Sequence, residues 1–353
     1  MDQIVLNHVT KQFTTKTLGT VTAVNDFNLT IKEGECFSFL GPSGCGKTTT
    51  LRMIAGFEDL SDGEIHLCGR PVSIKSKNLY VPPEERGLGM VFQSFAVWPH
   101  MNIFENVAFP LRVRKVPKAE MIERVKMALK HNSLDGMEKV YPGNLSGGQQ
   151  QRIALARAIV TNPKVMLLDE PLSNLDPKLR ETMRFEIKEL QKKFNFTIIF
   201  VTHDQSEAMA LSDRMMVMDM GNIVQIGTPT ELYNRPANRF VHKFLGQDGK
   251  VYAKGDMAHP LPVALPENGE REMVMATRPN QIEMNHTDGY KTKVEKRIFL
   301  TNYTEYLVRV GDQLLQVQTP HRNAFAQGET CYLKFPGIMW YGREDEQAEA
   351  ERN

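Results

Sequence analysis

Cysteine is scarce in this chain of 353 residues, which contains only Cys36, Cys45, Cys68 and Cys331. No two of them form a Cys-x-x-Cys pair, and no spacing typical of a zinc site is present. A disulfide framework and a zinc module are therefore excluded as the basis of the fold. This cysteine usage instead indicates a protein of a reducing compartment.

An excess of one charge and long apolar runs are missing as well. Lys and Arg number 43 and Asp and Glu 42, for a net charge of +1, which gives no reason to expect a nucleic-acid partner. No run approaches the ~20 apolar residues that a membrane helix needs. The N-terminal stretch MDQIVLNHVTKQF also lacks the apolar core of a signal peptide. If the protein works at a membrane, we expect other subunits to span it.

Short apolar runs alternate with helical patterns through the first two thirds of the chain, which predicts an α/β domain with a mainly parallel sheet. The glycine-rich loop after Leu40 is followed by TTTLRMIAG, a predicted helix ending at Gly56. From about 94 to 160, amphipathic patterns predict a helical subdomain inserted between strands. The predicted strands lie at 3–13, at 20–40, in ERGLGMVFQ up to Gln93, in VMLLDE (165–170) and in IIFVTH (198–203).

The composition of the sequence changes near residue 245, where Gly and Pro become frequent. YLVRVGDQLLQVQ predicts a hairpin around Gly311-Asp312, and TCYLKF predicts a further strand. We therefore expect residues 251–345 to form a small all-β, OB-like barrel, followed by a frayed, charged tail. The predicted domains are 1–240, which includes the helical subdomain, and 241–353.

The stretch GPSGCGKT at 41–48 matches the phosphate-loop pattern G-x-x-x-x-G-K-[ST]. A buried strand precedes it and a helix follows, so backbone N–H groups can point at phosphate oxygens. Lys47 would neutralise the β- and γ-phosphates of ATP, while the Thr48 hydroxyl and the Asp169 carboxylate would hold Mg²⁺. A glycine-rich turn that binds nothing is the alternative, but it leaves the downstream carboxylate unexplained. The predicted nucleotide-binding residues here are Gly41, Pro42, Ser43, Gly44, Cys45, Gly46, Lys47, Thr48 and Thr49.

Cys45 lies inside this loop, next to a lysine and at a helix N-terminus. Such surroundings can lower a thiol pKa, which makes a reactive, redox-sensitive Cys45 one hypothesis. The alternative, which we favour, is that a small residue is simply tolerated there.

LSGGQQQRIALARA, residues 145–158, predicts a helix that begins with two glycines. Glycine costs a helix ~1 kcal/mol relative to alanine. Ser146 as an N-cap explains the serine. It does not explain Gly147 and Gly148, which remove side chains where the helix dipole is positive. A second anion-binding helix start is the alternative to a merely capped helix.

Taken together, these motifs resemble those of ATP-binding-cassette (ABC) ATPases. The matching segments are the phosphate loop, Gln93, LSGGQ at 145–149, LLDEP at 167–171, SNLD at 173–176 and THD at 202–204, in the family's order. The resemblance covers residues 3 to about 240. It implies that two copies pair head to tail and that LSGGQ of one caps ATP on the phosphate loop of the other. Ser146, Gly147, Gly148 and Gln149 would then contact the nucleotide of the second copy.

The resemblance also implies the catalytic roles. Glu170 would polarise the attacking water as general base, and His203 would contact the γ-phosphate. Gln93 would contact Mg²⁺ and that water. The expected metal-binding residues are therefore Thr48, Gln93 and Asp169. Leu175 and Asp176 would meet the partner chain. Phe13 would stack on adenine, with core packing as the alternative.

Three kinds of protein use such a loop: transporter subunits, soluble cassette ATPases of DNA repair or translation, and small-molecule kinases. LSGGQ argues against a kinase. A single cassette without a coiled coil or zinc module argues against a repair or translation protein. QSFAVWPHMNIFENVAFPL, after Gln93, resembles the surface on which import-type cassettes receive membrane subunits. Its predicted apolar patch consists of Phe95, Val97, Trp98, Pro99 and Met101.

ATRPNQIEM at 276–284 resembles the hallmark of the small TOBE-type barrel of importers. We therefore expect the ATP-hydrolysing subunit of a bacterial importer on the cytoplasmic side of the inner membrane, with ATP and Mg²⁺ as cofactors. The sequence leans toward a small ion such as ferric iron, with phosphonate, polyamine or sugar as alternatives. The expected partners are a second copy, two permease subunits docking near Phe95–Met101 and, indirectly, a solute-binding protein, with no nucleic acid.

Overall fold

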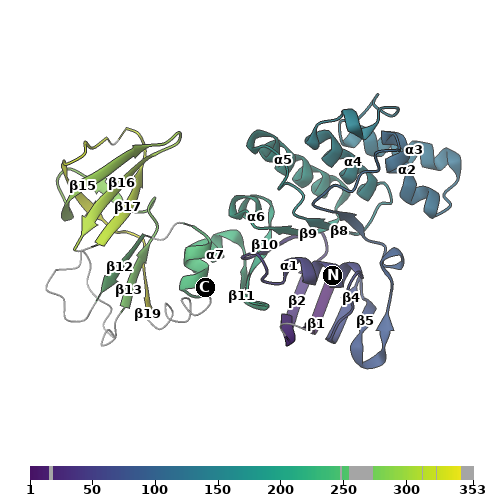
Figure 1. Cartoon of the computed structure of the whole chain (residues 1–353), viewed down its shortest axis with the longest axis horizontal. Helices are drawn as coiled ribbons and strands as arrows, with labels where there is room; N and C mark the ends of the chain where they lie inside the picture. The colour runs from purple at the N-terminus through teal and green to yellow at the C-terminus, as the bar shows by residue number, and fades with distance from the viewer. Residues whose placement is uncertain (16–18, 247–248, 254–272, 312, 323, 343–353) are drawn as a thin grey trace. The chain divides into compact units, whose positions relative to one another are not determined.

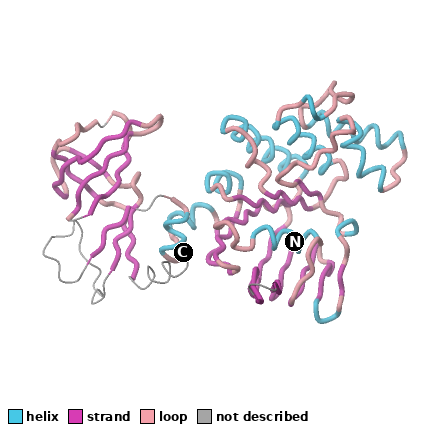
Figure 2. The backbone as a smooth tube through the Cα atoms, in the orientation of Figure 1, coloured by secondary structure: helices cyan, strands magenta, loops and turns pink. Residues whose placement is uncertain are grey.

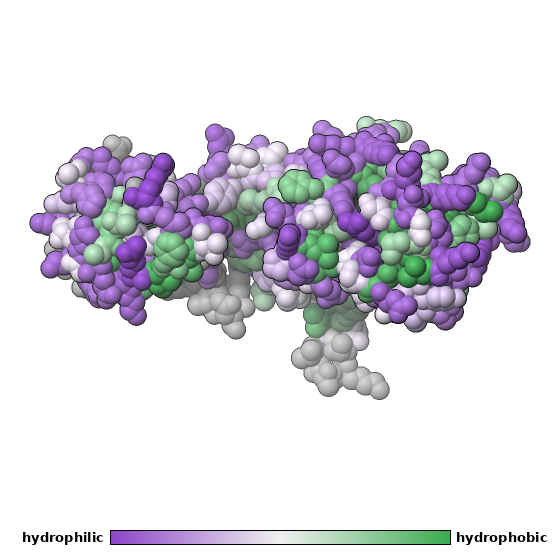
Figure 3. Space-filling model, turned by 90° about the horizontal axis from the view of Figure 1, so that it is seen from above, coloured by the Kyte–Doolittle hydropathy of each residue, from purple (hydrophilic) through white to green (hydrophobic). Residues whose placement is uncertain are grey.

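The structure of the chain is a computed structural model that describes residues 1–15, 19–246, 249–253, 273–311, 313–322 and 324–342. The chain divides into two compact units, Met1–Glu231 and Leu232–Asn353. Each unit has its own hydrophobic core. None of the helices in the described residues is both long and apolar enough to cross a membrane. Figure 3 shows one face, on which hydrophobic residues stand in separate groups among hydrophilic ones.

A six-stranded sheet forms the centre of the first unit, in the order β11-β10-β3-β9-β8-β7 (Figure 1). All neighbours in it are parallel except β11, which pairs antiparallel with β10, so the predicted mainly parallel sheet is confirmed. The strand predicted to run to Gln93 ends earlier, because the chain leaves the sheet after Val91. The strands are β3 (Cys36–Leu40), β7 (Gly89–Val91), β8 (Val165–Asp169), β9 (Thr197–Thr202), β10 (Arg214–Asp219) and β11 (Asn222–Gly227).

The two faces of this sheet carry different cores, because side chains alternate along each strand. Val165 and Leu167 of β8 face a core that contains α1 (Lys47–Ala55). Met166 and Leu168 face the core of the remaining helices. Figure 1 shows α1 on one side of the sheet and α4 and α5 on the other. Strands buried on both faces account for the continuous apolar runs in the sequence.

An antiparallel sheet, which the sequence did not predict as a separate layer, covers α1 (Figure 2). Its order is β2-β1-β4-β5-β6. Alternating burial in β2, with one face turned to the core, is typical of such a sheet. The strands are β1 (Asp2–Thr15), β2 (Gly19–Lys32), β4 (Asp62–Leu67), β5 (Arg70–Ile74) and β6 (Leu79–Tyr80).

The segment between β7 and β8 is helical, as predicted, with α2, α3 and α4 packed on one another. An Asn102–Glu105 capping box starts α2, and Pro117 precedes α3. The helices of the first unit after α1 are α2 (Ile103–Val113), α3 (Lys118–His131), α4 (Gly147–Ile159), α5 (Pro177–Phe194) and α6 (Gln205–Leu211), with α7 (Pro229–Asn234) at the boundary and short 3₁₀ turns at Lys75–Lys77, Pro83–Glu85 and Pro142–Asn144.

The second unit contains α8 (Arg239–Phe244) and strands in two sheets, β12-β13-β19 and β14-β18-β15-β16-β17. The predicted hairpin is confirmed as β16 and β17, although Asp312 in its turn lies outside the described residues. The tail predicted to fray, 343–353, also lies outside them. The strands are β12 (Gly249–Ala253), β13 (Met273–Thr277), β14 (Glu283–Asn285), β15 (Tyr290–Phe299), β16 (Thr304–Val310), β17 (Gln313–Thr319), β18 (Thr330–Lys334) and β19 (Ile338–Gly342).

Candidate functional site

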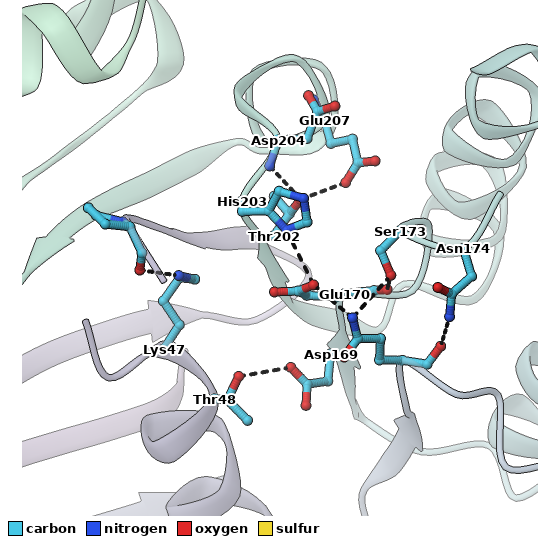
Figure 4. A network of polar contacts seen from close by, with 12 residues as sticks. Lys47, Thr48, Asp169, Glu170, Ser173, Asn174, Thr202, His203, Asp204 and Glu207 are labelled. Atoms are coloured by element: carbon cyan, nitrogen blue, oxygen red, sulfur yellow. Dashed lines mark hydrogen bonds and ion pairs between the residues drawn. The ribbon is translucent and has the colours of Figure 1, made fainter. Parts of the chain in front are cut away.

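The loop of residues 41–46 connects β3 to α1 and closes around Lys47 (Figure 4). The Lys47 ammonium donates to the carbonyl oxygens of Gly41, at 2.7 Å, and Pro42, at 2.8 Å. Its side chain is buried, so the positive charge is held inside the loop. A charge held there by backbone carbonyls can change partners to phosphate oxygens without moving the helix.

Gly46 places this loop against the antiparallel sheet. Its φ is +104°, and a Cβ atom there would lie 2.3 Å from the carbonyl oxygen of Ala23 in β2. Only glycine satisfies both conditions. Phe13 of β1 pairs with Val21, two residues before Ala23, and is partly exposed. The strand pair that carries Phe13 therefore borders the loop, with the Lys11 ammonium 4.8 Å from the centroid of its ring.

Cys45 is 4% exposed. Burial raises the pKa of its thiol, and the neighbouring Lys47 offsets this only in part. The hypothesis of a lowered thiol pKa is therefore wrong in direction, because the sequence shows the lysine and the helix start but not the burial.

Thr48 and Asp169 meet at the start of α1 and the end of β8. The Thr48 hydroxyl donates to Asp169 Oδ1 at 3.3 Å. Burial raises the pKa of Asp169, while the Thr48 hydrogen bond lowers it. Both side chains offer the hard oxygen atoms that Mg²⁺ prefers. Within the described ranges no group of three or more His, Cys, Asp or Glu residues could hold a metal.

Glu170, directly after β8, has a left-handed backbone with φ 45°. A non-glycine residue in this region costs about 1–3 kcal/mol and persists only where its surroundings fix it. Here the Glu170 N–H donates to the carbonyl of Val201, and the Ser173 hydroxyl donates to the Glu170 carbonyl, both at 2.9 Å. Backbone strain of this kind clusters at functional sites.

Gln93 and His203 converge on one carboxylate oxygen of Glu170. Figure 4 shows the His203 ring directed toward that carboxylate. The Gln93 amide nitrogen donates to Glu170 Oε2 at 3.1 Å, and His203 Nδ1 lies 3.2 Å from the same atom. Asn174 donates to the backbone carbonyl of Gln93 at 2.9 Å. The three converging side chains follow β7, β8 and β9, which are adjacent and parallel, so their carboxyl ends share one edge of the sheet.

The LSGGQ segment starts α4 with a capping box. Ser146 accepts from the Gln149 N–H, and the Gln149 side chain accepts from the Ser146 N–H at 3.0 Å. Gly148 is buried, and a Cβ on it would lie 2.4 Å from Leu179. Gly147 is exposed, and a Cβ on it would meet nothing closer than 3.6 Å. Packing inside the chain thus explains why residue 148 is glycine. It does not explain why residue 147 is glycine in a single copy.

The predicted apolar patch after Gln93 is only partly on the surface. Phe95 is 7% exposed and packs in the core, which corrects its assignment to the patch. Arg157 of α4 donates to the carbonyls of Phe95, at 2.8 Å, and Ala96, at 2.7 Å, and so fixes the backbone at Phe95. The same guanidinium lies over the Trp98 ring, 4.6 Å from its centroid. Pro99 is exposed, and Val97, Trp98 and Met101 are half-buried.

The loop of residues 173–176 also differs from the prediction. Leu175 is 5% exposed and packs in the core, so its side chain is not free for a partner, whereas Asp176 is exposed and caps α5. The reason is that the apolar side chain turns toward α4, where Gly147 lies near it. The sequence analysis missed Arg180 and Glu207, which pair beside His203. Their only sequence signal was a position close to SNLD and THD.

Comparison with known proteins shows the family of the chain. The family model described as ABC transporter matches residues 24–173. The chain is 47% identical to the spermidine/putrescine import ATP-binding protein PotA of Rubrobacter xylanophilus, over 87% of this chain and 83% of that protein. It is 46% identical to the Fe(3+) ions import ATP-binding protein FbpC of Escherichia coli, over 79% of each.

A solved structure with the same fold is the dimeric, post-hydrolysis state of the ATP-binding cassette MJ0796 bound to ADP and Pi. It has a TM-score of 0.56 and 31% identity, and it covers 64% of this chain and 98% of that one. The chain belongs to the ABC transporter family, as the ATP-hydrolysing subunit of an importer.

Proposed function

We propose that the chain binds ATP and Mg²⁺ at residues 41–49 and hydrolyses the nucleotide with Glu170 as general base. The observation that carries this proposal is the convergence of Gln93 and His203 on Glu170 Oε2. A carboxylate oriented by two hydrogen-bonding side chains at the edge of a phosphate loop suits a base that orients water. Mg²⁺ would be held by Thr48 and Asp169, with Gln93 nearby, and would neutralise phosphate charge. Phe13 is proposed to stack on adenine.

Two copies arranged head to tail would complete the site. In one copy, α1 and α4 pack on opposite faces of the central sheet, and the start of α4 is exposed at Ser146 and Gly147. A second copy would bring Ser146, Gly147 and Gln149 to the nucleotide, where a bare helix start attracts phosphate. The MJ0796 cassette was solved as a dimer, which supports this arrangement.

The remaining assignments follow from the importer family. We propose domains 1–240 and 241–353, with the second an OB-like barrel of TOBE type, and a peripheral location on the cytoplasmic side of the membrane. Two permease subunits would dock on the segment after Gln93, where Trp98, Pro99 and Met101 stay accessible, and a solute-binding protein would act through them. For the solute we propose a small ion of the ferric-iron type, as in the FbpC relative. The PotA relative makes a polyamine the second candidate.

The test is size-exclusion chromatography with light scattering on Glu170→Gln, with and without ATP and Mg²⁺. The variant should bind ATP, hydrolyse it at a negligible rate and shift from monomer to dimer. Adding Ser146→Arg should abolish the shift while ATP binding persists, because the arginine would fill the space of the phosphate contact. A chain that binds ATP and stays monomeric overturns the paired site, and a chain that binds none overturns the ATP site.

A further inference from the structure

Arg180 connects three segments around the hydrolysis site. It lies in the first turn of α5, and its Nη2 atom donates to the carbonyl of Leu175 at 3.1 Å. Its Nη1 atom lies 3.3 Å from Asp204 Oδ2, and its Nε atom lies 3.5 Å from Glu207 Oε1. One guanidinium therefore joins the backbone of loop 173–176 to the two carboxylates that follow His203.

The residues on both sides of His203, Thr202 and Asp204, are joined to each other and to Glu207 by hydrogen bonds (Figure 4). The Thr202 hydroxyl donates to Glu207 Oε2 at 2.6 Å and accepts from the Asp204 N–H at 3.0 Å. Asp204 Oδ1 caps α6 by accepting from the N–H groups of Ser206, at 2.8 Å, and Glu207, at 3.1 Å. The His203 backbone is therefore held between anchored neighbours, while its exposed ring contacts Glu170.

Glu207 is 2% exposed, and burial raises the pKa of its carboxyl group. The hydrogen bond from Thr202 and the charge of Arg180 offset this rise only in part. The guanidinium is wide enough to reach the Leu175 carbonyl and Asp204 from different nitrogen atoms while Nε faces Glu207, a span that the compact ammonium of a lysine does not cover. An ion pair with a structural role alone would also explain the contact between Arg180 and Glu207. Such a role would not require the additional hydrogen bond from Arg180 to the carbonyl of Leu175, the residue between Asn174 and Asp176.

We propose that Arg180 is a positioning residue for ATP hydrolysis, which ties loop 173–176 to the segment that holds His203 against Glu170. When a second copy presses on this loop, the displacement is passed through the guanidinium to Asp204 and thus to His203. The inference rests on the proposed function, in which a second copy approaches loop 173–176 and His203 acts at the γ-phosphate.

Steady-state ATPase kinetics and thermal unfolding of the full chain test this proposal with three variants: Arg180→Gln, Glu207→Gln and the double variant. Arg180→Gln should lower kcat by about tenfold to a hundredfold. KM for ATP should change less than about twofold, because the contacts that Arg180 makes are not part of the proposed ATP-binding loop. The substitution should also lower Tm, since Glu207 is left as an unpaired buried charge. The double variant should recover Tm, because no charge is left unpaired, while kcat stays low.

Recovery of kcat together with Tm in the double variant overturns the proposal, because the ion pair would then be only structural. Arg184→Gln is the matched control. Arg184 lies one turn further along α5 and makes no hydrogen bond or ion pair within the described part of the chain. Its kcat and Tm should equal those of the wild type, and an equal loss of kcat there also overturns the proposal.

Glu170→Gln, assayed in parallel, separates the two levels of inference. If that variant turned over ATP at the wild-type rate, the proposed hydrolysis site itself would be wrong. If turnover depends on Glu170 but Arg180→Gln leaves kcat unchanged, only the positioning role is overturned.

Discussion

His203 Nδ1 lies 3.2 Å from Glu170 Oε2, although 33 residues separate the two in the sequence. The contact exists because β8 and β9 are parallel neighbours whose ends lie side by side. A histidine on the carboxylate orients it, and removal of the carboxylate charge should leave the fold unchanged.

Glu170→Gln should therefore lower kcat by at least about a hundredfold, the usual contribution of a general base. ATP binding, followed with a fluorescent nucleotide analogue, should stay within about twofold, because Lys47 and the loop are untouched. Glu181→Gln, on the exposed face of α5, is the control and should behave like the wild type. A wild-type rate of phosphate release from Glu170→Gln would exclude Glu170 as the base.

Alanine substitutions at Gly147 and Gly148 of the LSGGQ segment should have different effects, one on dimer formation and the other on stability. Gly148→Ala should lower the free energy of unfolding by about 1–3 kcal/mol, because the new Cβ forces Leu179 to move. Gly147→Ala should be as stable as the wild type or more stable by up to ~1 kcal/mol, because alanine favours the helix, and it should weaken the ATP-dependent dimer of Glu170→Gln. Chemical denaturation and light scattering measure the two effects. Equal loss of stability in both variants would contradict this division.

Arg86 caps the C-terminal end of α1 and should be a major source of stability in the first unit. It donates to the carbonyls of Met53, at 2.7 Å, Ile54, at 2.9 Å, and Val81, at 2.7 Å, and burial lowers its pKa to about 10. Arg86→Met removes its hydrogen bonds to these carbonyls, of which that of Met53 keeps the Gly56 N–H as a donor, and should cost about 3 kcal/mol in urea unfolding. Arg70→Met, which removes one exposed hydrogen bond, is the control. Equal midpoints for both variants would refute the capping role.

His242 should make the second unit sensitive to acid. Burial first, and then the charges of Arg278 and Arg239, lower the pKa of His242 from 6.5 to about 4. The nearest ring is that of Tyr341, with centroids 5.7 Å apart. Between these two pKa values the unfolded chain binds a proton that the folded chain does not. Stability should therefore fall as the pH drops from about 6.5 to about 4, by up to about 3 kcal/mol.

Thermal unfolding at pH 7, 6, 5 and 4.5 checks this pH dependence. His242→Gln should remove it, because glutamine does not titrate in this range. His286→Gln, at an exposed position, should keep it. A His242→Gln profile that falls as steeply as that of the wild type would show that other groups carry the acid sensitivity.

The sequence by itself determined the local elements and the chemistry they carry. The glycine pattern predicted the turn between β3 and α1, and the apolar runs predicted strands buried on both faces. The order of the motifs predicted that Gln93, Glu170 and His203 belong to one site. The turn and the strands depend on the backbone freedom and hydropathy of neighbouring residues. The grouping of the three residues rests on the family resemblance of the motifs.

Only the tertiary structure decided which side chains remain available. Phe95 and Leu175 were predicted to lie at interfaces, yet both side chains are buried in the core, where Arg157 fixes the backbone of Phe95 and Leu175 lies near α4. The sequence offered a reactive Cys45 only as the less favoured hypothesis, and the fold buries its thiol. Gly148 is explained by Leu179, and Arg180 gains its role from three segments that only folding brings together. Burial and long-range pairing depend on distant parts of the chain, which no local pattern records.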